Sequence, residues 1–144
     1  MNLYVLDHAT TFDPVGFSAY AESNQGYNYR SPVNFTGLIT NAGNSYHPSN
    51  SSFVCPYAGV YLFSLTIQTD DDYTSEYKIM KDNTIVATAA EYSYIHYPTG
   101  ASVIIIECVS GERVWVRIGD RSAYLMGGTD RQSIFSGYML YQYD

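Results

Sequence analysis

The chain has 144 residues, the size of one domain, and 46% of them are hydrophobic, which is enough for a core. Its formal net charge is −7, so we expect no nucleic-acid partner, because binding a phosphate backbone requires a dense basic surface. No apolar run is long enough to cross a bilayer, so we expect no membrane insertion.

Residues 1–13 are expected to form an extension before the folded domain, which we place at 14–144. The extension has no basic stretch followed by a long apolar run, so it is not expected to act as a signal peptide as it stands. Whether a leader or a stalk precedes Met1 in the native protein stays open.

Beyond the extension, short segments alternate apolar and polar residues and are separated by Gly, Asn, Pro and Asp. The predicted strands are 15–21, 52–54, 60–69, 77–81, 84–89, 102–108, 113–118 and 133–141, with a shorter one at 33–36. The residues 81–84, KDNT, predict a hairpin turn because Asp and Asn tolerate left-handed backbone. Eight or more strands without an amphipathic helix predict an all-β sandwich, jelly roll or barrel.

The predicted strand at 60–69 is apolar on both faces. One face consists of Tyr61, Phe63, Leu65 and Ile67, and the other, mostly apolar or small, consists of Val60, Leu62, Ser64 and Thr66. A strand of a soluble sandwich normally keeps one face polar for water. Aromatic residues reach 16%, including 16 Tyr, which favours a strand protein that buries surface against another chain. A Tyr-rich monomer is the alternative.

The spacing of the aromatic residues carries a family resemblance. Phe35 is followed by Asn41, Tyr46 and Phe53, and then by Gly59, Tyr61 and Phe63. This pattern, best developed in ITNAGNSYHPSNSSFVCPYAGVYLFS (39–64), resembles the complement C1q globular-domain family, which shares the tumour-necrosis-factor-like jelly roll. Leu65 departs from it, because the family prefers Phe or Tyr there. PVGFSAY (14–20), TGASVIIIECVSGERVWVRI (99–118) and SIFSGYMLY (133–141) also resemble strands of the family.

The resemblance covers about residues 14–142 and is closest to the short, soluble C1q-domain proteins of invertebrates such as molluscs. It implies a two-sheet jelly-roll sandwich that assembles as a homotrimer, and no Gly-X-Y stalk is present in the sequence. In such a trimer Tyr61, Phe63, Leu65 and Ile67 are expected to face the sandwich core. The candidate trimer interface is then Val60, Leu62 and Ser64.

Enzyme chemistry is not expected. The three histidines, His8, His47 and His96, form no recognised metal-ligand spacing, and the sequence has no nucleophile elbow, phosphate-binding Gly loop or CxxC. The resemblance implies that some relatives bind calcium through acidic residues before the TGAS-like segment, but here that loop offers only Glu91. That site looks degraded, so no cofactor is expected. Asp70, Asp71 and Asp72 are better interpreted as a solvated turn than as a second calcium site.

Two loops supply the candidate ligand-binding residues: Tyr92, Tyr94, His96, Tyr97, Arg121, Tyr124 and Arg131. Exposed aromatic rings stack on sugars, and Arg binds carboxylates in a bidentate manner. The pattern therefore suits a glycan, with an acidic one such as a sialylated chain as one form. The alternative is that these Tyr pack between protomers and the Arg are solvated.

The resemblance implies a secreted, extracellular, lectin-like protein that recognises carbohydrate or microbial surfaces in innate immunity. An extracellular signalling ligand of the adipokine or cerebellin type, which binds a protein receptor, is the alternative, and a matrix component is a third. Two glycosylation triplets, Asn34–Thr36 and Asn50–Ser52, hint at secretion, and Asn50 is the better acceptor. Cys55 and Cys108 are either a disulfide or, as we favour, free buried thiols.

Overall fold

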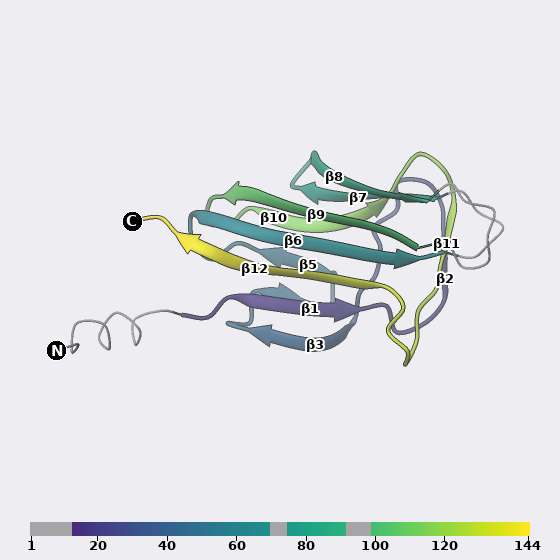
Figure 1. Ribbon diagram of the computed structural model, residues 1–144, viewed down its shortest axis with the longest axis horizontal. Helices are drawn as coiled ribbons and strands as arrows, with labels where there is room; N and C mark the ends of the chain where they lie inside the picture. The colour runs from purple at the N-terminus through teal and green to yellow at the C-terminus, as the bar shows by residue number, and fades with distance from the viewer. Residues whose placement is uncertain (1–12, 70–74, 92–98) are drawn as a thin grey trace.

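The computed structural model describes residues 13–69, 75–91 and 99–144, and all regular structure in these ranges is β-strand (Figure 1). The strands are β1 (Gly16–Tyr20), β2 (Gln25–Tyr27), β3 (Gly37–Ala42), β4 (Tyr46–His47), β5 (Ser52–Val54), β6 (Gly59–Gln68), β7 (Ser75–Lys81), β8 (Thr84–Glu91), β9 (Thr99–Cys108), β10 (Arg113–Ile118), β11 (Ala123–Leu125) and β12 (Ile134–Gln142).

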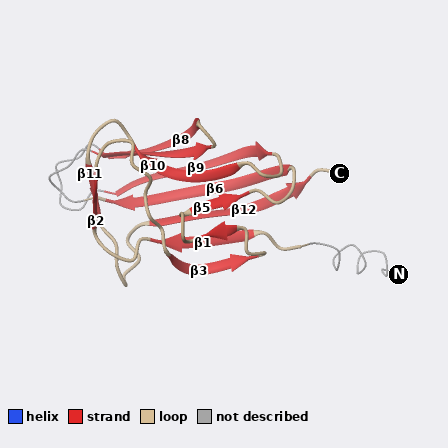
Figure 2. Ribbon diagram, turned by 180° about the vertical axis from the view of Figure 1, so that it is seen from behind, coloured by secondary structure: helices blue, strands red, loops and turns tan. Residues whose placement is uncertain are grey.

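Two five-stranded antiparallel sheets pack face to face. The first sheet has the order β3-β1-β12-β6-β9, and the second has the order β4-β5-β10-β7-β8. In Figure 1 the first sheet lies in front of the second, and Figure 2 shows the same two layers from behind. The short pair β11-β2 lies at the end of the sandwich opposite the C-terminus. This is the predicted all-β jelly-roll sandwich.

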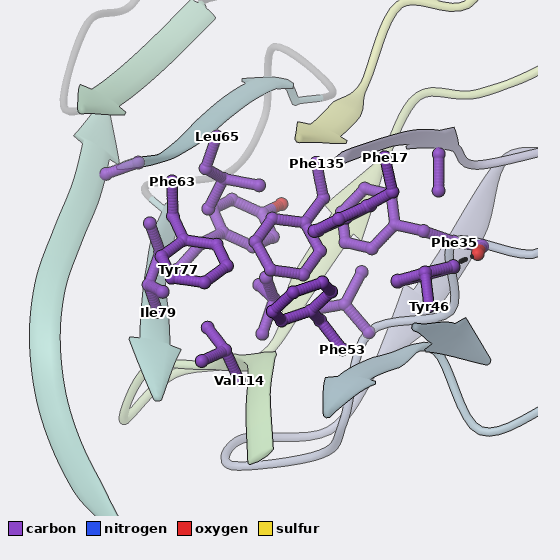
Figure 3. Packing of buried hydrophobic residues seen from close by; sticks show 14 of the residues in the cluster. Phe17, Phe35, Tyr46, Phe53, Phe63, Leu65, Tyr77, Ile79, Val114 and Phe135 are labelled. Atoms are coloured by element: carbon purple, nitrogen blue, oxygen red, sulfur yellow. Dashed lines mark hydrogen bonds between the residues drawn. The ribbon is translucent and has the colours of Figure 1, made fainter. Parts of the chain in front are cut away.

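The core lies between the sheets, and a cluster of aromatic rings lies within it (Figure 3). Tyr61, Phe63, Leu65 and Ile67 of β6 are at most 1% exposed, as the alternation in the sequence predicts. Phe17 of β1 lies among the aromatic rings of the core. The centre of its ring is 4.5 Å from that of Tyr46 and 5.0 Å from that of Phe135. Full burial of such a side chain contributes about 1.5–3 kcal/mol, so this cluster supplies much of the driving force for folding.

The family-typical spacing of Phe35, Asn41 and Tyr46 corresponds to one hydrogen-bonded unit. Tyr46 Oη donates to the Phe35 carbonyl oxygen at 2.7 Å, and Asn41 Nδ2 donates to the Tyr46 carbonyl oxygen at 2.9 Å. The Tyr46 amide in turn donates to Asn41 Oδ1 at 3.2 Å. Because Asn41 belongs to β3 and Tyr46 to β4, these bonds tie the edge of the first sheet to the edge of the second.

The predicted strand at 33–36 is wrong, because the strand in this region is β3, which begins at Gly37. The amides of 33–35 donate to three different partners: the Val116 carbonyl, Tyr27 Oη and Ser51 Oγ. These residues therefore follow no single neighbouring strand. The short strands β2, β4 and β11 have no counterpart among the predicted segments.

Gly59 begins β6 where the neighbouring strand β12 departs from regular register, between Met139 and Tyr141. A Cβ atom on Gly59 would lie 2.2 Å from the Tyr141 carbonyl oxygen, so only glycine permits this approach.

Candidate functional site

The outward side of the first sheet carries an apolar stretch on β6 and β9. We call it the apolar face, and it consists of Val60, Leu62 and Ser64 of β6 with Val103 and Ile105 of β9. Leu62 pairs with Ile105, and Ser64 pairs with Val103, all on the side away from the core. Val103 is 68% exposed and Ile105 is 60% exposed. Glu107, at one end of β9, is the one charged side chain among the outward positions of these two strands.

The apolar face follows from the local sequence. In SVIIIE (102–107) every second residue from Val103 to Glu107 is exposed, while Ile104 and Ile106 pack against the core. A β-strand turns successive side chains to opposite faces, so a continuous run of Val and Ile makes both faces apolar. β6 behaves in the same way: Val60, Leu62 and Ser64 are half-buried on the outward side, as predicted from the sequence.

Next to β9 and β6 the surface is hollowed by small side chains. Ser64, Ser136, Ser18 and Thr40 are cross-strand partners in one row over β6, β12, β1 and β3. Ser18 Oγ and Ser136 Oγ are 2.8 Å apart and share a hydrogen bond. This row lines a hollow of about 340 Å³ together with Gly16, Ala42, Leu62 and Tyr138. The first sheet therefore presents an apolar ridge on β9 beside a groove of small residues.

The outward face of the second sheet has the opposite character. Arg113, Trp115 and Arg117 alternate outward along β10, and Arg117 lies opposite Lys78 of β7. The guanidinium carbon of Arg113 lies 4.8 Å from the centre of the Trp115 ring. Lys78 pairs with Glu76 at 3.6 Å. A charged, solvated surface of this kind is stable in water, whereas an exposed apolar face commonly marks a surface that another molecule buries.

The predicted ligand residues Arg121, Tyr124 and Arg131 lie in or near β11 and in the segment before β12. The Arg131 guanidinium carbon lies 4.9 Å from the centre of the Tyr20 ring at the end of β1. Tyr124 lies in β11, opposite Gly26 of β2. Arg121 is exposed and has no hydrogen-bond or ion-pair partner among the residues that the structure describes.

The remaining predicted ligand residues, Tyr92, Tyr94, His96 and Tyr97, lie outside the described residues, as do Asp70, Asp71 and Asp72. Glu91 ends β8, and its side chain also lies outside the described part. Within 13–69, 75–91 and 99–144 no group of three or more His, Cys, Asp or Glu residues could hold a metal ion.

The buried titratable groups belong to the core. Tyr61 Oη donates to the Tyr57 carbonyl oxygen at 2.6 Å, and burial raises the pKa of Tyr61 to about 12. Cys55 and Cys108 are free and each is 1% exposed. A hydrogen bond to Cys108, together with burial, raises the pKa of the Cys55 thiol. The Cys55 thiol therefore stays protonated at neutral pH, whereas its hydrogen bond lowers the pKa of Cys108. Neither thiol has the solvent exposure that a reactive cysteine needs.

Sequence reasoning identified the β6 part of the apolar face but missed its β9 part, which contains the most exposed apolar side chains. The sequence does contain a sign of two apolar faces on β9, because Val103 and Ile105 alternate with Ile104 and Ile106. A run of this kind is ambiguous on its own, since a strand buried on both faces has the same pattern.

A sequence model of the family described as "C1q domain" matches residues 16–140. The chain is 26% identical over 117 residues to mouse (Mus musculus) complement C1q tumor necrosis factor-related protein 3, covering 80% of this chain and 47% of that protein. It is 30% identical over 128 residues to human (Homo sapiens) multimerin-1, covering 85% of this chain and 10% of that protein. The chain therefore spans about half or less of these relatives.

Solved structures that share the fold include a complement globular domain and a TNF. The globular domain of zebrafish complement 1qA superposes with a TM-score of 0.73 at 15% identity, covering 90% of this chain and 99% of the other. The Eiger TNF of S. frugiperda superposes with a TM-score of 0.75 at 15% identity, covering 92% and 96%. In the described part of the chain no helix is long and apolar enough to span a membrane.

Proposed function

Because the chain belongs to the C1q domain family, we propose that it is an extracellular, homotrimeric binding protein that recognises carbohydrate or microbial surfaces in innate immunity. The apolar face of β6 and β9 carries the first part of this proposal. Proteins with the C1q and tumour-necrosis-factor fold typically assemble as trimers, and this chain offers a surface suited to such assembly.

The shape of the first sheet supports a ring of protomers. The ridge formed by Val103 and Ile105 and the groove along the Ser64 row are different surfaces of one chain. An interface between two different patches of identical chains is heterologous, and it closes into a ring when the rotation between copies permits. In a trimer each ridge would pack near the groove of the next protomer, and Leu62 would be buried beside the axis.

Burial of this surface has a clear energetic reason. Removing apolar surface from water contributes roughly 25 cal/mol per Å². Monomeric proteins rarely leave large contiguous apolar patches exposed, and such patches commonly mark interaction surfaces. Ser18, Ser64 and Ser136 are small enough to let a neighbouring backbone approach closely.

Carbohydrate recognition is proposed for the end of the sandwich that carries β2 and β11. The exposed Arg121 offers a guanidinium group without a partner among the described residues, and an acidic sugar would supply the carboxylate for it. Two aromatic side chains lie near this end, Tyr124 of β11 and Tyr20, whose ring has the Arg131 guanidinium over it. Tyr92, Tyr94, His96 and Tyr97 remain proposed ligand contacts on the strength of the sequence.

A receptor ligand of the adipokine type is the second candidate function. It is favoured by the match to a complement C1q tumor necrosis factor-related protein, which extends over 80% of this chain. The same trimer and the same exposed loops would serve it, with a protein in place of the sugar. We expect no calcium requirement for either function.

A glycan array on the intact assembly tests this proposal. Saturable binding to acidic glycans is expected, with at least a tenfold loss in Arg121→Ala and Tyr94→Ala. Lys81→Ala is the matched control, because this lysine lies at the far end of β7 and pairs with Glu112 at 3.6 Å. Silence on the array, together with saturable binding to one cell-surface protein, would replace the first function by the second.

A further inference from the structure

Two Asn-X-Ser/Thr triplets that lie 16 residues apart in the sequence meet in space. Asn34–Thr36 precedes β3, and Asn50–Ser52 leads into β5. The Phe35 amide donates to Ser51 Oγ at 2.8 Å, so the middle residues of the two triplets are hydrogen-bonded to each other. The buried Tyr46 hydroxyl donates to the Phe35 carbonyl oxygen and so also fixes the position of Phe35.

The contact orients each triplet in the same way. Phe35 is 0% exposed and Ser51 is 3% exposed, so the middle residues anchor both segments in the protein. Asn34 and Asn50 are both exposed. Two asparagine side chains therefore reach solvent from neighbouring backbone segments.

Among the residues that the structure describes, neither asparagine side-chain nitrogen has a hydrogen-bond partner. Asn50 Oδ1 accepts a hydrogen bond from Ser52 Oγ at 2.6 Å, which leaves Asn50 Nδ2 without a partner among the described residues. Asn34 uses its backbone amide and carbonyl, toward Tyr27 Oη and Gln25 Nε2, but not its side chain. Asn41 differs, because its Nδ2 donates to the Tyr46 carbonyl oxygen inside the structure.

We propose that Asn34 and Asn50 are N-glycosylated and that their oligosaccharides form one glycan patch at the β3/β4 edge of the sandwich. The donor is a dolichyl-pyrophosphate-linked oligosaccharide. Asparagine Nδ2 bonds to the anomeric carbon of the first sugar, the bond from that carbon to the pyrophosphate oxygen breaks, and dolichyl pyrophosphate leaves. The nitrogen gives up one proton to the transferase. This proposal rests on the extracellular route of the proposed function.

The position of the patch gives it a physical role. β3 and β4 are edge strands, and unpaired strand edges invite pairing with other chains. Glycans at this edge would cover it. β9, which carries the apolar ridge, is the opposite edge strand of the first sheet, so the patch lies away from the ridge.

The test is the intact mass of the chain made behind a cleavable secretion signal in a eukaryotic cell line, before and after peptide-N-glycosidase F. The wild-type protein is expected to lose mass on treatment. Asn34→Gln and Asn50→Gln should each retain one enzyme-sensitive glycan, and the double variant should retain none. Thr36→Ala should match Asn34→Gln, because it removes the required hydroxyl without touching the acceptor.

Three controls isolate the triplets. Thr36→Ser and Ser52→Thr preserve the hydroxyl and should lose the same mass as the wild type on enzyme treatment. Asn44→Gln changes an exposed asparagine that is followed two positions later by Tyr46 and not by Ser or Thr, so it should leave the enzyme-sensitive mass unchanged.

The intact mass is measured for both the intracellular and the secreted protein. Wild-type protein with the bare peptide mass in both pools would overturn the proposal, and modification of a single asparagine would overturn the paired patch. A secreted chain that binds glycans on the array but has no enzyme-sensitive mass would contradict this inference and leave the proposed function standing.

Discussion

Tyr46 is a buried residue with both a packing and a hydrogen-bonding role. Its ring stacks on Phe17 at 4.5 Å, and its hydroxyl donates to the Phe35 carbonyl oxygen at 2.7 Å. The spacing of Phe35, Asn41 and Tyr46 could be recognised in the sequence. Its cause could not, because sequence alone does not show that Asn41 bonds to both the amide and the carbonyl of Tyr46.

Tyr46→Phe is expected to lower the free energy of unfolding at pH 7 by about 1–3 kcal/mol, because it leaves the buried Phe35 carbonyl oxygen without its donor. Urea denaturation measures this loss. Tyr29→Phe is the control, since Tyr29 is 63% exposed and its hydroxyl should contribute little. Equal unfolding midpoints for the wild type and Tyr46→Phe would contradict the role assigned to this hydroxyl.

The same variant should change the response to alkaline pH. Burial raises the pKa of Tyr46 above its usual value. Above about pH 10 the unfolded chain loses the Tyr proton while the folded chain keeps it, so stability is fully present below pH 10 and falls as pH rises further. Tyr46→Phe should make this alkaline decline shallower in urea titrations above pH 10.

At the scale of the strands, prediction succeeded where long runs alternate and failed where a few residues are held by distant partners. The predicted bounds of β10 are those observed, and those of β6 differ by one residue at each end. β11 has only three residues and is positioned by Gln25–Tyr27 and by a bridge from Leu125 to Thr69. The contact of Arg131 with Tyr20, which is far away in the sequence, could not be predicted for the same reason.

Gly137→Ala tests the close packing of β12 on the core. A Cβ at Gly137 would lie 2.4 Å from Phe63 Cδ1 and 2.9 Å from Phe17 Cε1, both inside contact distance. Overpacking of this kind costs about 1–3 kcal/mol, and thermal unfolding should show the loss. Gly26→Ala is the control, because its nearest contact would be an ordinary 3.4 Å to Tyr124 Cδ2. Equal stability of the two variants would contradict the tight packing at β12.

At the scale of the whole molecule, the two outer surfaces of the sandwich differ in kind. β10 and β7 present Arg, Lys and Glu side chains to water, whereas β6 and β9 present Val, Leu and Ile. The sequence indicated this asymmetry through the second apolar face of β6. A matched pair of substitutions separates the two surfaces: Ile105→Asp on β9 and Ile85→Asp on β8, where Ile85 is 47% exposed.

Sedimentation equilibrium at micromolar concentration tests the central claim, that the apolar face is the interface of a homotrimer. The wild-type chain is expected to sediment at about three times 16.1 kDa. Ile105→Asp and Leu62→Asp should dissociate it, because each would bury an unpaired charge, while Ile85→Asp should leave it intact. A wild-type chain that sediments as a single species of 16.1 kDa would contradict the account.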